Sequence, residues 1–322
     1  MKPFPFYVLL TIALSISTVL CEPSFCKSDR AKSYLCSGDE GIDGYDTILA
    51  DLANDTFDLL INGGRFSELG GRPFENFAQL EILWIIGSRL EVIKDSAFIG
   101  LIQLKVLTIN GKLKTVEENT FTSCPMLETI NFPHNQIVNL LPFTLAMAPL
   151  TNLRKVEFLD NPTLESVHEN DFAPLRDSPL SIIQFTRCNI RKIGEGAFSH
   201  LTILRRLFLS ENPLDEENLA NALFNITSEL NFLELNNVNV TEIPRKALDH
   251  LSNTKIEELS MKNNKFQTIP AGSFPKMPNL IDLSLSYGSL EWIDAGVFEN
   301  WPTLQKLDVS YNNKLTILFG RN

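Results

Sequence analysis

One stretch of the sequence has a spacing of apolar residues that decides the fold. Residues Ile256–Asn279 read IEELSMKNNKFQTIPAGSFPKMPN, and Asn264 stands alone at the polar break. The apolar side chains are Ile256, Leu259, Met261, Phe266, Ile269, Phe274 and Met277. This L-x-x-L-x-L-x-x-N-x-L spacing fits neither the period of a helix nor the alternation of a plain strand. We interpret the stretch as one unit of a repeat, with a short strand, a turn and a return limb that carries Phe274.

The same pattern recurs along most of the 322-residue chain. Ten units, with starts 23 to 27 residues apart, begin at Leu80, Leu104, Leu127, Leu153, Leu180, Leu204, Leu230, Ile256, Leu280 and Leu304. A degenerate unit with Leu59 and Ile61 in its strand precedes them, and the last unit is incomplete at Asn322. Repeats of this kind stack around one continuous core. The sequence therefore predicts an α/β solenoid over residues 58–322: a leucine-rich-repeat horseshoe with a parallel β-sheet on its concave face.

Each position of a unit has a predicted role. Positions 1, 4 and 6, such as Leu204, Leu207 and Leu209, are expected to point into the core. At position 9, an amide can bond to backbone groups of the turn; the residues there are Asn135, Asn161, Asn212, Asn264 and Asn312. The return limbs carry Phe followed three residues later by Leu or a similar side chain, which predicts a phenylalanine spine opposite the strands.

The cysteines predict one disulfide and two buried thiols. Residues 22–57 are expected to form an N-terminal cap, with Cys26 bonded to Cys36 and a short helix over residues 46–52. Cys188 occupies position 9, and Cys124 follows Phe121 by three residues in a core position. These two are expected to lie about 14 Å apart, since stacked strands are spaced by ~4.8 Å, and to stay unpaired.

The N-terminus has the features of a secretory signal peptide. Lys2 precedes an apolar stretch from Phe6 to Leu20, and residues 19–21 resemble a cleavage site, which predicts removal of residues 1–21. A membrane anchor is the alternative, although a span needs about 20 mostly apolar residues. A lipoprotein site at Cys21 is a further alternative that bulky Leu20 disfavours. We therefore expect a secreted, extracellular protein without a membrane span.

Charge and motif content exclude several function classes. Removing residues 1–21 leaves 27 basic and 39 acidic residues, a net charge of −12, which argues against a nucleic-acid partner. The four histidines, His134, His168, His200 and His250, are scattered and form no metal-binding motif. Motifs for a nucleophilic serine or for phosphate binding are missing. We expect a non-enzymatic protein that binds neither a cofactor nor a metal ion.

The outward-facing strand residues predict a binding surface on the concave face. We expect positions 2, 3, 5, 7 and 8 of successive units to form one continuous surface. The candidate partner-binding residues are Trp84, Ile86, Arg154, Lys155, Arg187, Arg205, Arg206, Phe208, Phe232, Tyr287 and Tyr311. Aromatic side chains beside Arg are typical of interface hot spots, and a basic zone would attract an acidic partner or glycan. The alternative is a mixed-charge face that serves solubility, with Trp84 covering the N-terminal edge.

Three N-x-S/T sequons, at Asn54, Asn225 and Asn239, predict N-linked glycans. Asn54 falls in the cap, Asn225 in a return limb, and Asn239 just after position 9. None is on the expected concave face, so glycans could be carried there without covering it.

Units such as LRRLFLSENPL, followed by a limb with A-F-x-x-L, resemble the typical-class repeats of extracellular animal proteins such as Toll ectodomains and chaoptin. More narrowly, the Cys26–Cys36 cap is similar to that of arthropod proteins related to the oplophorus-luciferin 2-monooxygenase non-catalytic subunit. The broad resemblance implies an extracellular protein partner, such as a matrix or cell-surface protein. The narrow one implies an accessory subunit of a secreted enzyme, and a third reading is innate recognition of microbial glycan or lipid. Oligomeric state and ligand stay open.

Overall fold

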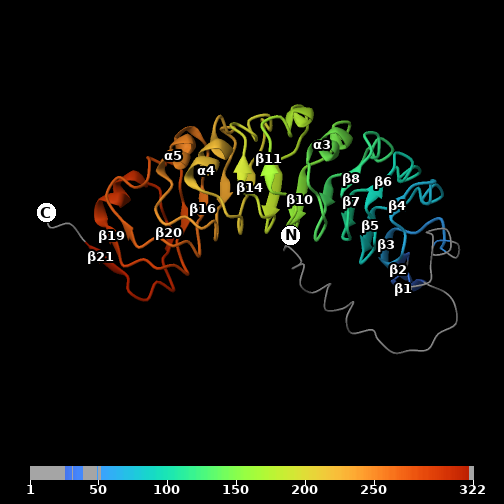
Figure 1. Cartoon of the computed structure of the whole chain (residues 1–322), viewed down its shortest axis with the longest axis horizontal. Coiled ribbons are helices and arrows are strands. Elements are labelled where there is room, and N and C mark those ends of the chain that lie inside the picture. The colour runs from blue at the N-terminus through green and yellow to red at the C-terminus, as the bar shows by residue number, and fades with distance from the viewer. Residues whose placement is uncertain (1–25, 31, 39–48, 50–51, 319–322) are drawn as a thin grey trace.

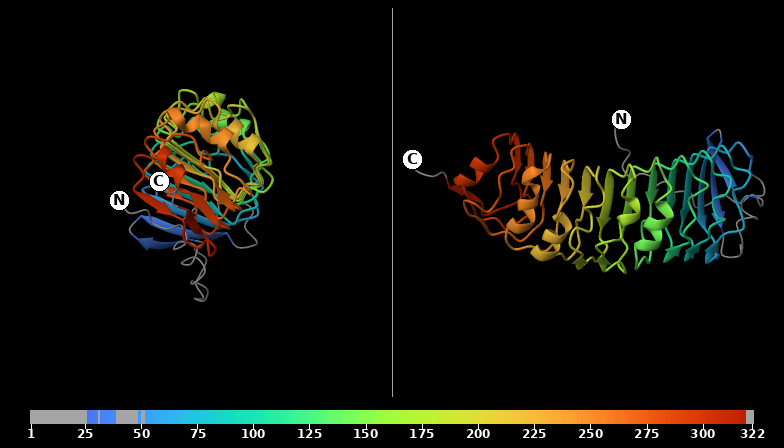
Figure 2. Two further views of the ribbon diagram at one scale, coloured as in Figure 1. Left: turned by 90° about the vertical axis from the view of Figure 1, so that its left-hand side faces the viewer. Right: turned by 90° about the horizontal axis from the view of Figure 1, so that it is seen from above.

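The computed structural model describes residues 26–30, 32–38, 49 and 52–318. The signal peptide expected over residues 1–21 lies outside these residues, as do five of the seven residues of the short helix expected over residues 46–52. The described chain winds into an arc in which stacked strands line the inner curve and helices and loops form the outer one (Figure 1). The two further views show a single row of coils from one end to the other (Figure 2).

A 13-stranded sheet lines the inner curve in the order β1-β2-β3-β5-β7-β9-β10-β12-β14-β15-β16-β18-β20. From β2 onward neighbouring strands are parallel. The strands are β1 (Cys26–Arg30), β2 (Ser33–Gly38), β3 (Asp58–Gly63), β5 (Ile82–Ile86), β7 (Val106–Ile109), β9 (Thr129–Asn131), β10 (Lys155–Leu159), β12 (Ile182–Thr186), β14 (Arg206–Phe208), β15 (Phe232–Glu234), β16 (Glu258–Ser260), β18 (Asp282–Ser284) and β20 (Lys306–Asp308). Each strand from β5 to β20 begins at the third position of its unit, so the predicted fold and register are confirmed.

Three small sheets run along one side of the coils, where each return limb starts. They are β4-β6-β8, β11-β13 and β17-β19-β21. Their strands are β4 (Glu68–Leu69), β6 (Val92–Ile93), β8 (Thr115–Val116), β11 (Ser166–Val167), β13 (Lys192–Ile193), β17 (Thr268–Ile269), β19 (Trp292–Asp294) and β21 (Thr316–Leu318). The outer curve carries the helices α3 (Leu141–Met147), α4 (Glu216–Leu223) and α5 (Arg245–Asp249) and the 3-10 turns η1 (Ala173–Leu175), η2 (His250–Asn253) and η3 (Ala295–Asn300).

The position-9 asparagines fasten each coil to the one before it. In the Leu204 unit, Asn212 Oδ1 accepts from the backbone N–H groups of Cys188 and Ile190, and Asn212 Nδ2 donates to the Phe185 carbonyl. Asn135, Asn161, Asn264 and Asn312 each donate in the same way to a carbonyl of the preceding coil. These amides therefore satisfy backbone groups that the strand ladder does not reach.

The core confirms the inward positions but arranges phenylalanine differently from the single spine we expected. Phe74, Phe98 and Phe121 stack in one row on the return limbs, with centroids 6.2 and 5.9 Å apart. A second row comes from position 6 of the strands, where Phe132, Phe158 and Phe185 stack at 5.6 and 5.1 Å. On the return limbs Phe172 and Phe198 also pack together, with centroids 5.4 Å apart, whereas the limbs before and after them contain α3 and α4.

A hairpin covers the first edge of the sheet. Strand β1 pairs antiparallel with β2, and β2 pairs parallel with β3, so β2 carries the hydrogen bonds that a bare first coil would leave unmade. Cys26 and Cys36 face each other in the hairpin and form the expected disulfide. Cys124 and Cys188 are unpaired and fully buried, as expected.

Candidate binding surface

Two rows of side chains run across the concave sheet because the strands pair without a shift from β3 to β20. The row at position 3 consists of Asp58, Ile82, Val106, Thr129, Lys155, Ile182, Arg206, Phe232, Glu258, Asp282 and Lys306. The row at position 5 consists of Leu60, Trp84, Thr108, Asn131, Glu157, Gln184, Phe208, Glu234, Ser260, Ser284 and Asp308. The surface passes from apolar at one end, through aromatic and basic residues, to acidic at the other.

An aromatic-arginine cluster lies near the middle of this face, on β14 and β15. The rings of Phe208 and Phe232 are half-buried, with centroids 4.8 Å apart. Above them the Arg206 guanidinium carbon lies 4.3 Å from the Phe232 centroid and 5.4 Å from the Phe208 centroid. Such a cation over aromatic faces is a favourable contact that also holds the three side chains in one arrangement. The structure thus brings together three of the candidate residues.

Two of the other four basic candidates, Arg187 and Lys155, are neutralised by acidic neighbours. Arg187 forms a two-point contact with Asp160, with Nε–Oδ1 at 2.6 Å and Nη2–Oδ2 at 2.9 Å, and Nη1 lies 3.0 Å from Glu211 Oε1. Lys155 Nζ lies 2.7 Å from Glu157 Oε1. Arg154 and Arg205 are exposed. Here the positive charges that could attract an acidic partner are mainly Arg154, Arg205 and Arg206.

The ionic contacts of Arg187 belong to the row at position 8, which was expected on the concave face but without the backbone conformation that the structure shows. Nine residues of this row have a left-handed backbone, with φ from 52° to 64°: Gly87, His134, Asp160, Arg187, Glu211, Asn237, Asn263, Tyr287 and Tyr311. This conformation turns the chain out of the strand and places side chains of successive units side by side. Because most of these residues are not Gly or Asn, residue type alone gave no signal of the turn.

The C-terminal part of the face is acidic and slightly hollowed. A depression of about 220 Å³ is lined by Phe232, Glu234, Glu258, Leu259, Ser260, Lys262, Asp282, Ser284, Lys306 and Asp308. Hydrogen bonds from Ser310 hold the pKa of Asp308 down, to about 2, so this carboxylate stays charged at neutral pH. Lys306 Nζ lies 2.6 Å from Asp282 Oδ2 and offsets part of the negative charge.

The remaining candidate residues lie toward the two ends of the face. Tyr287 and Tyr311 stack with ring centroids 4.2 Å apart and are 54% and 64% exposed. Trp84 and Ile86 are half-buried on β5, where Trp84 lies opposite Leu60 and Thr108 in the ladder. The aromatic candidates therefore occupy three separate places and do not form one continuous patch.

The three sequon asparagines, Asn54, Asn225 and Asn239, are all exposed, and none lies on a strand of the concave sheet. Among the described residues no three His, Cys, Asp or Glu side chains are grouped so as to hold a metal ion. No helix in that part of the chain is long and apolar enough to cross a membrane.

Comparison with known proteins supports the repeat assignment. Six copies of the BspA type leucine rich repeat region match over residues 67–205 and 145–248, and a second leucine rich repeat model matches residues 254–315. Mouse podocan is 27% identical over 69% of this chain and 34% of its own length. Toll-like receptor 3 of Bos taurus is 27% identical over 71% of this chain and 26% of its own length. The chain thus spans about a third or less of these two relatives.

Solved structures show the same fold. Toll in the Toll–Spatzle complex of Drosophila has a TM-score of 0.62 at 18% identity, over 87% of this chain and 41% of that one. RP105 in the mouse RP105/MD-1 complex has a TM-score of 0.58 at 17% identity, over 87% of this chain and 50% of that one. With the matched repeats covering most of its length, this chain belongs to the leucine-rich-repeat proteins, of the animal extracellular type that podocan and the Toll-like receptors represent.

Proposed function

We propose that this protein is a secreted binding protein that acts without catalysis and captures an extracellular protein on its concave face. The observation that carries the proposal is the cluster of Arg206, Phe208 and Phe232, held in one arrangement on the concave face of the sheet, over which no helix or strand of the described residues lies. Arg and aromatic side chains are over-represented among residues whose truncation weakens interfaces most. Preorganised side chains also lose little conformational freedom on binding.

The relatives support a protein as the ligand. Toll and RP105, which share the fold, were solved in complexes with the proteins Spatzle and MD-1. The neutralised Arg187 disfavours a strongly acidic glycan, since little unpaired positive charge is left beyond Arg154, Arg205 and Arg206. We therefore favour a partner that places an apolar or carboxylate-bearing segment on the cluster.

The test compares affinity capture by the full secreted chain with capture by the double variant Arg206→Ala/Phe232→Ala. Arg176→Ala and Val138→Ala are the controls, since both residues are exposed outside the concave sheet. Extracellular fluid of the source is the sample, and thermal unfolding verifies that every variant is folded. We expect the double variant to lose a partner that wild type and both controls retain, with Kd raised about 30-fold or more. The same proteins captured equally by all four chains would overturn the proposal. A stoichiometric enzyme as the captured partner would identify an accessory subunit, whereas a matrix or cell-surface protein would indicate recognition or adhesion.

A further inference from the structure

The side of the solenoid that carries the small sheets is interrupted over the Leu204 and Leu230 units, where no described strand lies between β13 and β17. Strand β17 pairs with β19, but no described strand pairs with its other edge, which faces residues 241–243. In intact parts of this side, Lys94 N donates to the Leu69 carbonyl and Gly194 N donates to the Val167 carbonyl. The equivalent position of the Ile256 unit is occupied by Pro270, which has no backbone N–H to donate. Pro270 therefore removes one of the N–H groups that could join this coil to residues 241–243.

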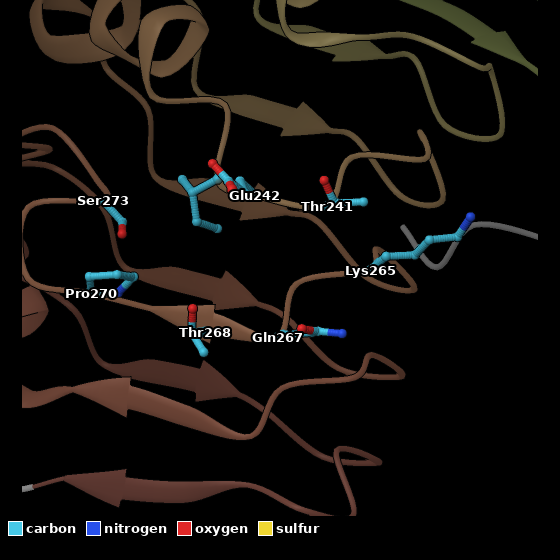
Figure 3. Close-up of a pocket in the computed structure, with 8 residues that line it drawn as sticks. Thr241, Glu242, Lys265, Gln267, Thr268, Pro270 and Ser273 are labelled. Atoms are coloured by element: carbon cyan, nitrogen blue, oxygen red, sulfur yellow. The ribbon is translucent and has the colours of Figure 1, made fainter.

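The interruption leaves a hollow of about 530 Å³, here named the seam hollow. Its lining is Thr241, Glu242 and Ile243 from one coil and Lys265, Gln267, Thr268, Pro270 and Ser273 from the next. Figure 3 shows Thr241 and Glu242 on one side of the space and Gln267, Thr268 and Pro270 on the other. Its volume is within the range of about 300–1,000 Å³ that small-molecule sites occupy. Most of the lining is polar, so the hollow suits a polar occupant better than an apolar one.

A glycosylation sequon lies at the mouth of this hollow. Asn239, Val240 and Thr241 form the sequon, and Thr241 is itself part of the lining. Asn239 is exposed and left-handed, with φ of 67°, and its Oδ1 accepts a hydrogen bond of 2.6 Å from Lys265 Nζ. This contact directs the Asn239 amide toward the coil on the other side of the hollow. Asn54 and Asn225 are exposed too, but neither belongs to a sequon that lines the hollow.

We propose that Asn239 carries an N-linked glycan whose innermost sugars lie in the seam hollow. There their hydroxyl and acetamide groups would meet Glu242, Gln267 and Thr268 and cover the unpaired edge of β17. In the modification step, Asn239 Nδ2 forms a bond to the anomeric carbon of a polyprenyl-diphosphate-linked oligosaccharide. The bond from that carbon to the diphosphate oxygen breaks, the polyprenyl diphosphate leaves, and Nδ2 loses one proton. This inference rests on secretion, which is part of the proposed function.

The test uses the full chain expressed in a eukaryotic secretory host. Glycopeptide mass spectrometry measures the occupancy of each sequon, and a time course with a glycan-cleaving amidase on folded protein measures the release rate at each site. We expect Asn239 to be occupied and its glycan to be released at least ten-fold more slowly than the one on Asn225, with the difference abolished by unfolding. Thr268→Tyr, which fills the hollow and keeps the sequon, should speed release at Asn239.

Stability gives an independent readout. Thr241→Ala removes the sequon and keeps Asn239, whereas the matched control Thr241→Ser preserves the sequon. We expect Thr241→Ala to lower the Tm by about 2–4 °C and Thr241→Ser or Asn225→Gln to leave it nearly unchanged. An unmodified Asn239 beside a modified Asn225, or equal release rates at the two sites, would overturn the proposal. Either result would leave intact the proposal that the aromatic-arginine cluster captures a protein partner. Retention of the chain inside the cell would overturn both proposals.

Discussion

Arg187 and Asp160, 27 residues apart in the sequence, form a two-point ionic contact between neighbouring coils. Both residues have a left-handed backbone. Glu211 of the following coil bonds to the third guanidinium nitrogen at 3.0 Å. The hydrogen bond from Arg187 holds the pKa of Asp160 below its usual value. This row of charges ties three consecutive coils together at the rim of the concave face.

Arg187→Ala should therefore destabilise the protein in a pH-dependent way. Because Arg187 is almost half exposed, we expect a cost of only about 0.5–1 kcal/mol at pH 7. A lowered folded-state pKa of Asp160 stabilises the fold at pH above the unfolded value of about 3.9. That contribution is lost progressively as pH falls below about 3.9 and through the lower folded pKa, so the stability difference between the variant and wild type should shrink on acidification. Urea unfolding at pH 7 and at pH 3 checks this, and a difference that grows on acidification would contradict it.

Arg191→Ala is the matched control for this experiment. Arg191 is exposed, and its Nη2 donates to Asn189 Oδ1 within the same coil. Its truncation should change the free energy of unfolding by less than about 0.5 kcal/mol at both pH values.

Asn212→Ala should be among the most destabilising polar substitutions. The change leaves the buried N–H groups of Cys188 and Ile190 and the Phe185 carbonyl without their partner. Each unsatisfied buried group costs about 1–3 kcal/mol, so a loss of about 3 kcal/mol or more is expected. Asn110→Ala is the control. Asn110 is half-buried, and its side chain makes no hydrogen bond with the described residues. Equal urea midpoints for the two variants would show that the asparagine ladder contributes nothing.

The repeat register was predictable because a continuous core demands leucine-like residues at fixed positions, and Leu204, Leu207 and Leu209 are fully buried as expected. The cysteine states were predictable for the same reason, since Cys188 and Cys124 occupy core positions. The pairing of Arg187 with Asp160 was not predictable. Position 8 was expected on the concave face, but the turn conformation that brings these two side chains together was unknown. The contact between Arg187 and Glu211 depends on the same turn conformation and was not predictable either.

The interruption beside Pro270 could have been found in the sequence. Pro at a position where other units donate an N–H to the preceding coil predicts a broken ladder. The two phenylalanine rows were harder to anticipate, because the sequence did not indicate that two of the return limbs contain the helices α3 and α4. The candidate residues of the concave face were named one by one from the sequence and remain a prediction as a binding surface. Which of them touch one another depends on contacts between units more than 20 residues apart.

Cys124 and Cys188 should resist alkylation in the folded protein at any pH from 7 to 9. Burial raises the pKa of each thiol to about 12, so almost no thiolate forms in that range. In the unfolded chain the pKa returns to about 8.5, and both thiols should react readily. Mass spectrometry of iodoacetamide-treated peptides, from folded and from urea-unfolded protein, measures this. Rapid labelling of folded protein that accelerates between pH 7 and 9 would contradict the burial of these thiols.

Asn263 offers the clearest test of the left-handed row at position 8. Its φ is 55°, its side chain is exposed, and its backbone N–H donates to the Ser286 carbonyl at 2.9 Å in the next coil. Glycine adopts this conformation freely, whereas a β-branched residue is strongly disfavoured there. Asn263→Gly should thus stay within about 0.5 kcal/mol of wild type, and Asn263→Val should lose about 1–2 kcal/mol.

Lys262→Val controls for placing a β-branched apolar residue on this surface. Lys262 is the neighbouring residue, lies outside the left-handed row and keeps its backbone hydrogen bond to Asn236 Oδ1 in the variant. Its free energy of unfolding should change by about 0.5 kcal/mol or less. If Asn263→Val and Lys262→Val proved equally stable in urea, the left-handed turn would not be a constraint on this row. A loss confined to Asn263→Val would show instead that the backbone, and not the side chain's contacts, limits which residues can stand at the rim of the concave face.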